Sequence, residues 1–206
     1  MSLNLNVTIK EVVMTKQLGR IALSTLAAVL LCASAPLGQE KMQPEHYAAT
    51  WAVVGGVAGG STVSIDIRIN RFNTDEEVMK LAELLKEKGQ DALRRALEQE
   101  DVGQISPTAR VGTPIAIARK LKSGNKTIVR VITARNLPFL ELRYSGRSTD
   151  YPFTIVQLDL DEQGKGTGTG IGAASIRFSK KENTLEIESF QQGTSVNKLM
   201  NVYQMK

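Results

Sequence analysis

Residues 151–190, YPFTIVQLDLDEQGKGTGTGIGAASIRFSKKENTLEIESF, decide the fold expected for this chain. Three segments in this stretch have the short apolar runs or the period-two alternation of β-strands. They are residues 152–160, 167–178 and 184–188. Polar turn residues at 161–166 and 180–183 separate them. Strands joined by such short turns predict an antiparallel meander.

Glycines occupy every second position from Gly164 to Gly172, so one face of the middle strand carries almost no side chains. A bare face permits sharp bending or close packing of another element. It equally leaves room for a ligand, which makes Gly168 and Gly170 candidate ligand-binding positions. A dinucleotide-binding glycine motif would have to open a helix, whereas residues 173–178 have the pattern of a strand.

The upstream sequence predicts a first strand followed by two helices. Residues 61–70 alternate strictly between apolar and polar side chains, which is typical of a half-buried strand. A helical pair is expected over residues 74–100. Thr74 and Glu77 have the spacing of a capping box at its start, and Gly89 is placed to end the first helix.

Residues 113–122 and 127–135 predict two strands around the turn 123–126, and residues 196–203 predict a last strand. Together these elements predict a single α+β domain over residues 61–206. Its sheet is expected to have about six or seven mostly antiparallel strands, curved into a sandwich or an open barrel. The helical pair would be inserted after the first strand. Ile67 and Leu158 are expected core positions.

The N-terminal segment has the organisation of a secretory signal peptide. Residues 14–20 are basic, residues 21–31 are apolar and uncharged, and residues 32–35 are small. The apolar run is shorter than the roughly 20 residues that a membrane-spanning helix needs. We therefore predict a leader over residues 1–38, with the signal peptide at 14–35, and a flexible linker over residues 39–60. The mature chain would be exported, periplasmic or extracellular, with no transmembrane span.

Cys32 is the only cysteine and His46 the only histidine in the 206 residues. A lipid anchor on Cys32 is the less favoured alternative, because lipoprotein processing usually requires a small residue where Leu31 stands. Once the leader is removed, no disulfide and no zinc site of cysteines and histidines can form. A Ser–His–Asp triad is not expected, because His46 lies in the predicted linker. No metal or cofactor is predicted.

Two further groups of residues are candidate binding sites. Glu141 is the only acidic residue between Val102 and Thr149, and the basic residues of the hairpin there form a candidate anion-binding patch. They are Arg119, Lys120, Lys122, Lys126 and Arg130. Such a patch would attract an anionic surface, or it simply keeps a sheet edge soluble. Nucleic acid is not expected, because only 5% of the residues are aromatic.

The irregular segment 136–150 is the other candidate, because long loops often carry function. Its apolar residues Phe139, Leu142 and Tyr144 are candidate contacts to an apolar small molecule.

The second half of the chain resembles a group of uncharacterised exported bacterial proteins, mainly over residues 151–203. The resemblance rests on a succession of short segments, which are Tyr151-Pro152-Phe153-Thr154, Gly164-Lys165-Gly166, Leu185-Glu186-Ile187-Glu188 and Asn201-Val202. It implies no activity. We expect an exported, non-catalytic binding or structural module. The alternative is a carboxylate-dependent extracytoplasmic hydrolase, with candidate acids and bases at Asp66, Asp150, Asp159 and Asp161.

Export has a direct test. The mature protein is expected to begin between Ala33 and Lys41, because the small residues that signal peptidases require, 32–35, lie at the start of this region. Intact-mass measurement of protein from the secreted or periplasmic fraction checks the cleavage point. Recovery of full-length chain from the cytosol would contradict the prediction.

Overall fold

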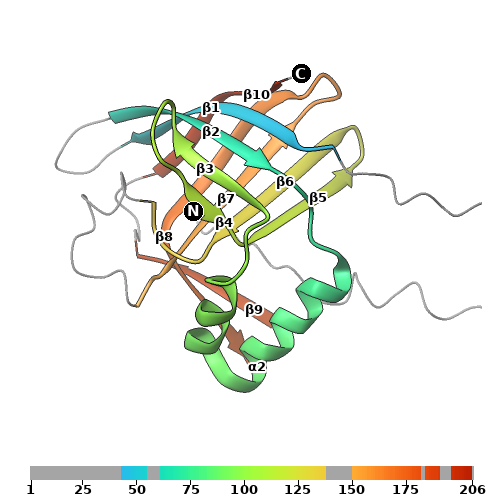
Figure 1. Cartoon of the computed structure of the whole chain (residues 1–206), viewed down its shortest axis with the longest axis vertical. Coiled ribbons are helices and arrows are strands. Elements are labelled where there is room, and N and C mark those ends of the chain that lie inside the picture. Colours follow the sequence, from blue (N-terminus) through green and yellow to red (C-terminus); the bar gives the residue numbers. More distant parts are fainter. Residues whose placement is uncertain (1–42, 55–60, 138–149, 182–183, 191–195, 206) are drawn as a thin grey trace, which may run out of the picture.

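The computed structural model describes residues 43–54, 61–137, 150–181, 184–190 and 196–205 (Figure 1). Within these residues the chain forms one sheet of ten strands, with helix α2 lying outside it. The elements are β1 Glu45–Val54, β2 Ser61–Ile69, α2 Asp75–Leu97, β3 Gly103–Pro107, β4 Thr113–Ile115, β5 Ile117–Ser123, β6 Lys126–Thr133, β7 Phe153–Leu160, β8 Lys165–Ser179, β9 Thr184–Ser189 and β10 Val196–Met205.

The sheet is a nearly closed antiparallel barrel, in the strand order β4-β3-β2-β1-β10-β8-β7-β6-β5. The two ends of this order, β4 and β5, are consecutive in the chain and are separated only by Ala116. Strand β4 pairs with β3, and strand β5 pairs with β6. The backbone N–H of Ala116 donates to the carbonyl of Ile132 at 2.9 Å. One continuous segment therefore joins the two edges of the sheet and leaves few unpaired edge groups.

Asn73 fastens the connection between β2 and α2 to the edge of β5. Its backbone N–H donates to the carbonyl of Ala118 at 2.9 Å, and its side-chain oxygen accepts from the N–H of Ala118 at 2.8 Å. Asn73 is buried, so these bonds satisfy groups that would otherwise be costly to bury. Arg119 adds a hydrogen bond to the Asn73 carbonyl and an ion pair to Asp75.

The predicted α+β fold with a helical pair is wrong. The structure is a ten-stranded sheet that forms a nearly closed barrel, with β9 paired to β8 outside the barrel order, and residues 74–100 contribute a single helix, α2. Gly89 departs from helical geometry (φ 78°, ψ −176°), and α2 is kinked there. The predicted linker is also wrong over Glu45–Val54, which form β1.

Several local predictions are confirmed. The capping box of Thr74 and Glu77 is present; the hydrogen bond from the Thr74 backbone, reinforced by Arg71, lowers the pKa of Glu77. The hairpin around residues 123–126 is β5–β6, and the last predicted strand is β10.

The barrel interior is a packed hydrophobic core. Inward-facing residues of β1, β2, β6, β7 and β10 meet there, and Ile67 and Leu158 are fully buried among them as expected. A second cluster lies outside the barrel wall, where Leu85, Leu93 and Leu97 of α2 pack on the outer faces of β5, β7 and β8. The helix thus covers one end of the wall and leaves the opposite end of the barrel uncovered (Figure 1).

Strand β8 serves both cores because it is 15 residues long. Its first part pairs with β10 and its last part with β9, so the β8–β9 hairpin extends beyond the barrel toward α2 (Figure 1). Gln90, directly after the kink at Gly89, ties the helix to this extension. Its side-chain oxygen accepts from the N–H of Ile176 at 2.9 Å, and its side-chain nitrogen donates to the carbonyl of Asp150 at 3.2 Å.

The glycine face of β8 is filled by the protein itself. A Cβ atom at Gly170 would lie 2.5 Å from Cη2 of Trp51, and one at Gly168 would lie 3.3 Å from Cβ of Leu199. Trp51 is fully buried, and its indole nitrogen donates to the side-chain oxygen of Asn197 at 3.2 Å. The missing side chains make room for an indole ring inside a narrow barrel.

Adding a methyl group at Gly170 tests this packing. Gly170→Ala is expected to lower the free energy of unfolding by about 1–3 kcal/mol, because the new Cβ overlaps the ring of Trp51. Trp51 is the only tryptophan, so denaturant unfolding followed by its fluorescence reports on the affected contact. Thr169→Ala is the control, since Thr169 lies on the other face of β8 and is expected to change stability little. Equal stability of the two variants would contradict the packing.

Candidate functional site

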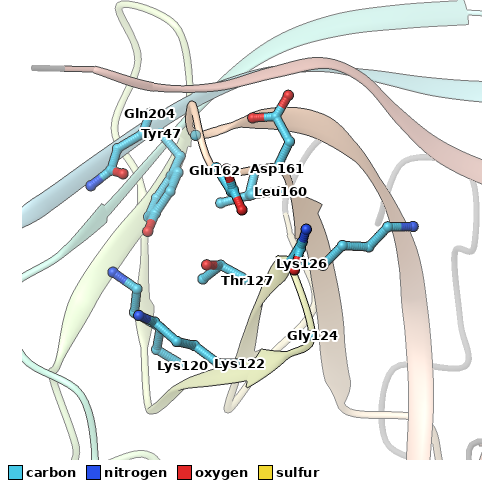
Figure 2. A pocket seen from close by; sticks show the side chains of 12 residues that line it. Tyr47, Lys120, Lys122, Gly124, Lys126, Thr127, Leu160, Asp161, Glu162 and Gln204 are labelled. Carbon is cyan, nitrogen blue, oxygen red and sulfur yellow. The ribbon is translucent and has the colours of Figure 1, made fainter.

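The open end of the barrel carries a polar pocket of about 310 Å³ (Figure 2). Four parts of the chain converge on it: the β5–β6 hairpin, the β7–β8 turn, the start of β1 and the end of β10. The lining residues are Tyr47, Lys120, Lys122, Gly124, Asn125, Lys126, Thr127, Leu160, Asp161, Glu162, Gly164 and Gln204. We call this the mouth pocket. A second, larger hollow of about 590 Å³ beside it shares Lys120 and Gln204 and reaches Glu45 and Phe72.

The register of the β5–β6 hairpin directs two lysines into the mouth pocket. Lys120 pairs with Val129, and Lys122 pairs with Thr127. Directly paired residues of antiparallel strands share a face of the sheet, and Val129 is fully buried in the barrel core. Lys120 and Lys122 therefore lie on the inward face, where the apolar interior gives way to the open end.

Glu45 joins Tyr47 and Lys120 on one side of the pocket. The Tyr47 hydroxyl donates to Oε2 of Glu45, and Nζ of Lys120 lies 2.6 Å from Oε1 of the same carboxylate. The pKa of Tyr47 is raised by burial, and further by the hydrogen bond and the negative charge of Glu45. Lys120 also lies over the ring of Phe72, with Nζ 5.8 Å from its centroid. The charge of Lys120 is thus already balanced within the protein.

The opposite wall is the β7–β8 turn, which has a fixed backbone. Oδ1 of Asp161 accepts from the N–H groups of Gln163 at 2.8 Å and Lys165 at 2.9 Å. Gly164 has a positive φ of 75°, and its carbonyl accepts from the N–H of Gln204 at 2.8 Å. Asp161 therefore shapes the turn. Glu162 is exposed and lines the pocket, which it approaches from the side opposite the two lysines (Figure 2).

The five basic residues of the hairpin do not form one patch. Lys120 and Lys122 face inward, whereas Arg119, Lys126 and Arg130 belong to the outer face, since Arg119 pairs with Arg130 and Lys126 with Ser123. The two-residue turn makes even-numbered residues of β5 pair with odd-numbered residues of β6. Even-numbered residues of the two strands therefore lie on opposite faces of the hairpin. Arg119 and Arg130 are further engaged, by Asp75 and by the side-chain oxygen of Gln157. The five residues therefore do not lie on one face of the hairpin, and anion binding by them stays a prediction.

The other predicted ligand positions lie elsewhere. Gly168 and Gly170 line the packed interior against Leu199 and Trp51 rather than an open cavity. Phe139, Leu142 and Tyr144 lie outside the described residues.

The four candidate acids are dispersed over the barrel. Asp66 is on the outside of β2, with one oxygen 3.4 Å from Nε2 of His46. This places the only histidine in β1, not in a linker. Asp159 accepts from the side chain of Gln157 on the outer face of β7, and Asp150 is exposed near α2. Of these four, Asp161 alone lines the mouth pocket.

Sequence reasoning missed Glu45, Tyr47, Thr127 and Glu162 as pocket residues. The first two were overlooked because β1 was taken for a linker. The only signal for β1 is the alternation of Tyr47, Ala49 and Trp51 with more polar residues, and alanine weakens that pattern. Thr127 and Glu162 carry no pattern that marks a pocket, because their meeting depends on how β5, β6 and β7 associate.

Comparisons with protein families, curated proteins and solved structures found no match for this chain. In the described part of the chain, no helix is long and apolar enough to cross a membrane. The same residues contain no group of three or more histidine, cysteine, aspartate or glutamate side chains placed to hold a metal ion.

The buried Tyr47 hydroxyl predicts a loss of stability at high pH. Because its pKa in the folded protein is raised above the ordinary value of 10.0, the unfolded chain ionises first as pH rises. The stabilisation is complete below pH 10 and falls above it by about 1.4 kcal/mol per pH unit. Urea unfolding between pH 8 and pH 11 should show the advantage of wild type over Tyr47→Phe shrinking above pH 10.

The exposed Tyr203 of β10 provides the matched control. The difference between wild type and Tyr203→Phe is expected to stay constant over the same pH range. A constant difference for Tyr47→Phe as well would contradict the burial of the hydroxyl beside Glu45.

Proposed function

We propose that this protein is an exported, non-catalytic binding module that holds a small polar ligand in the mouth pocket. The observation that carries the proposal is the pocket itself, a concavity lined by convergent polar side chains at the open end of a barrel whose interior is packed. Small-molecule sites commonly occupy the mouths of β-barrels, in cavities of about 300–1,000 Å³. At about 310 Å³, the mouth pocket suits a ligand at the small end of this range.

The packed interior directs the ligand to the mouth rather than into the barrel. Tyr47 and Leu160, which line the pocket, are buried, and so are Leu158 and Val202 of the same core. A ligand placed deeper would have to displace these side chains and the contacts they make, at a cost of several kcal/mol for each large residue. The mouth needs no such rearrangement, because its polar groups already face an open volume.

The dispersion of the carboxylates favours binding over hydrolysis. General acid–base catalysis needs its groups within hydrogen-bonding reach of one substrate, yet Asp66, Asp150 and Asp159 lie away from the mouth pocket. Asp161 is held by backbone N–H groups of its own turn. The pocket offers a lysine-lined side and an acidic side, which is an arrangement for holding charged groups.

Export is part of the proposal and is supported by the basic, apolar and small-residue order of residues 14–35. The only cysteine lies in this segment, so the barrel is built without a disulfide. Its stability then comes from the interior core and from the cluster under α2.

Obstruction of the pocket tests the proposal. Thr127→Phe places a ring in the mouth pocket, whereas Thr167→Phe places the same ring on the outer face of β8 as a matched control. Small molecules that copurify with each mature protein are measured by mass spectrometry after denaturation. A compound present in wild type and in Thr167→Phe is expected to be lost from Thr127→Phe, with melting temperatures confirming that both variants fold.

Two outcomes would count against the mouth as the ligand site. One is equal retention of the compound by both variants. The other is a wild-type protein that carries no small molecule from its native source and none after exposure to a concentrated extract of that source.

A further inference from the structure

Among the described residues, three charged side chains that line the mouth pocket have no partner in the protein: Lys122, Lys126 and Glu162. Lys126 belongs to the outer face of the hairpin, and its side chain points away from the pocket (Figure 2), which leaves Lys122 and Glu162 inside it. Lys120 is paired with Glu45, and Asp161 is held by its own turn. By contrast, among the described residues neither Lys122 nor Glu162 takes part in a hydrogen bond or an ion pair, although both line the pocket. They are also not paired with each other, so their charged atoms lie more than 4.0 Å apart.

The strand register fixes the separation of the backbone segments that carry these two charges. Lys122 of β5 pairs with Thr127 of β6, which in turn pairs with Leu160 of β7. Glu162 follows two residues after Leu160, in the turn whose backbone Asp161 and Gly164 hold in place. Neighbouring strands are about 4.8 Å apart, so the two walls are about 10 Å apart at the level of their backbones. The hydroxyl-bearing Thr127 lies between them.

A positive wall facing a negative wall selects the kind of ligand. A simple anion such as phosphate would be attracted by Lys122 but would face Glu162 and Asp161 across the pocket. A simple cation would be attracted by Glu162 but repelled by Lys120 and Lys122 across the pocket. A molecule that carries both an ammonium and a carboxylate meets an opposite charge at each end, and like charges on the wrong wall act against a reversed orientation.

We propose that the mouth pocket binds small zwitterions, such as a free amino acid or a short peptide, with the ligand carboxylate at Lys122 and its ammonium at Glu162. The proposal rests on the mouth pocket being the ligand site and names the class of ligand. Thr127 is placed to donate its hydroxyl to the carboxylate. The walls are held before binding, Lys122 by the β5–β6 ladder and Glu162 by its turn, so little ordering of the backbone accompanies binding.

The test uses isothermal titration of the mature protein with defined probes. Glycine, L-glutamine and glycylglycine carry both charges, N-acetylglycine lacks the ammonium, glycine ethyl ester lacks the carboxylate, and inorganic phosphate is a simple anion. At least one probe that carries both charges should bind, and its analogues lacking one charge should bind at least about tenfold more weakly, because each analogue loses one charge-assisted contact. Vesicles of phosphatidylethanolamine form a separate arm, since its headgroup is also zwitterionic.

Variants assign the two charges. Lys122→Gln and Glu162→Gln are each expected to weaken zwitterion binding at least about tenfold. Their matched controls, Lys198→Gln on β10 and Glu186→Gln on β9, change exposed residues outside the pocket and should leave the affinity unchanged. Glu162→Gln should also narrow the preference for glycine over N-acetylglycine, since it removes the partner of the ammonium.

The outcomes separate this inference from the proposed function. Binding of phosphate or N-acetylglycine with no binding of zwitterions would overturn the inference and leave the mouth as a ligand site. Zwitterion binding that is unaffected by Lys122→Gln and Glu162→Gln would also overturn it. Binding of phosphatidylethanolamine vesicles without binding of free amino acids would support a zwitterion site and assign it to a headgroup. The proposed function itself is tested separately, by the comparison of Thr127→Phe with Thr167→Phe.

Discussion

The continuity of the chain through Ala116 is the constraint on which the barrel depends. Because β4 pairs with β3 and β5 pairs with β6, one extended segment holds both edges of the sheet at a fixed distance. The other strands must then curve enough to meet it. The hydrogen bonds of Asn73 to Ala118 occupy part of the edge of β5 opposite β6, and they place the start of α2 there.

A barrel closed in this way has a narrow interior. The glycines of β8 leave space there for large side chains of other strands. With no Cβ at Gly170, the indole of Trp51 can lie against the backbone of β8. The interior is therefore filled by the protein's own residues. A small barrel either fills with side chains or holds one small ligand, and this barrel has the first arrangement. The consequence for function is geometric, because a ligand finds open volume only where the strands end.

At that open end some charged side chains have partners within the protein and others do not. Glu45 satisfies Lys120 and the hydroxyl of Tyr47 together, which closes the floor of the pocket on one side. Asp161 satisfies the turn on the other side. Lys122 and Glu162 remain, on walls that are held apart by β6 and the turn. A pocket with fixed walls and two opposite charges discriminates by the arrangement of charge on its ligand as much as by size.

The sequence by itself determined the elements whose signals are local. The alternation of residues 61–70, the capping box of Thr74 and Glu77 and the turn between β5 and β6 all appear in the structure as expected, because period, caps and turns depend on neighbouring residues. It also located Ile67 and Leu158 in the core. The tertiary structure alone decided that β1 belongs to the sheet, that the glycine face receives Trp51 and that β4 and β5 close a barrel. It alone separated Lys120 and Lys122 from Arg119, Lys126 and Arg130. These outcomes depend on pairing between residues far apart in the chain, and a shift of one position in register would exchange the two faces.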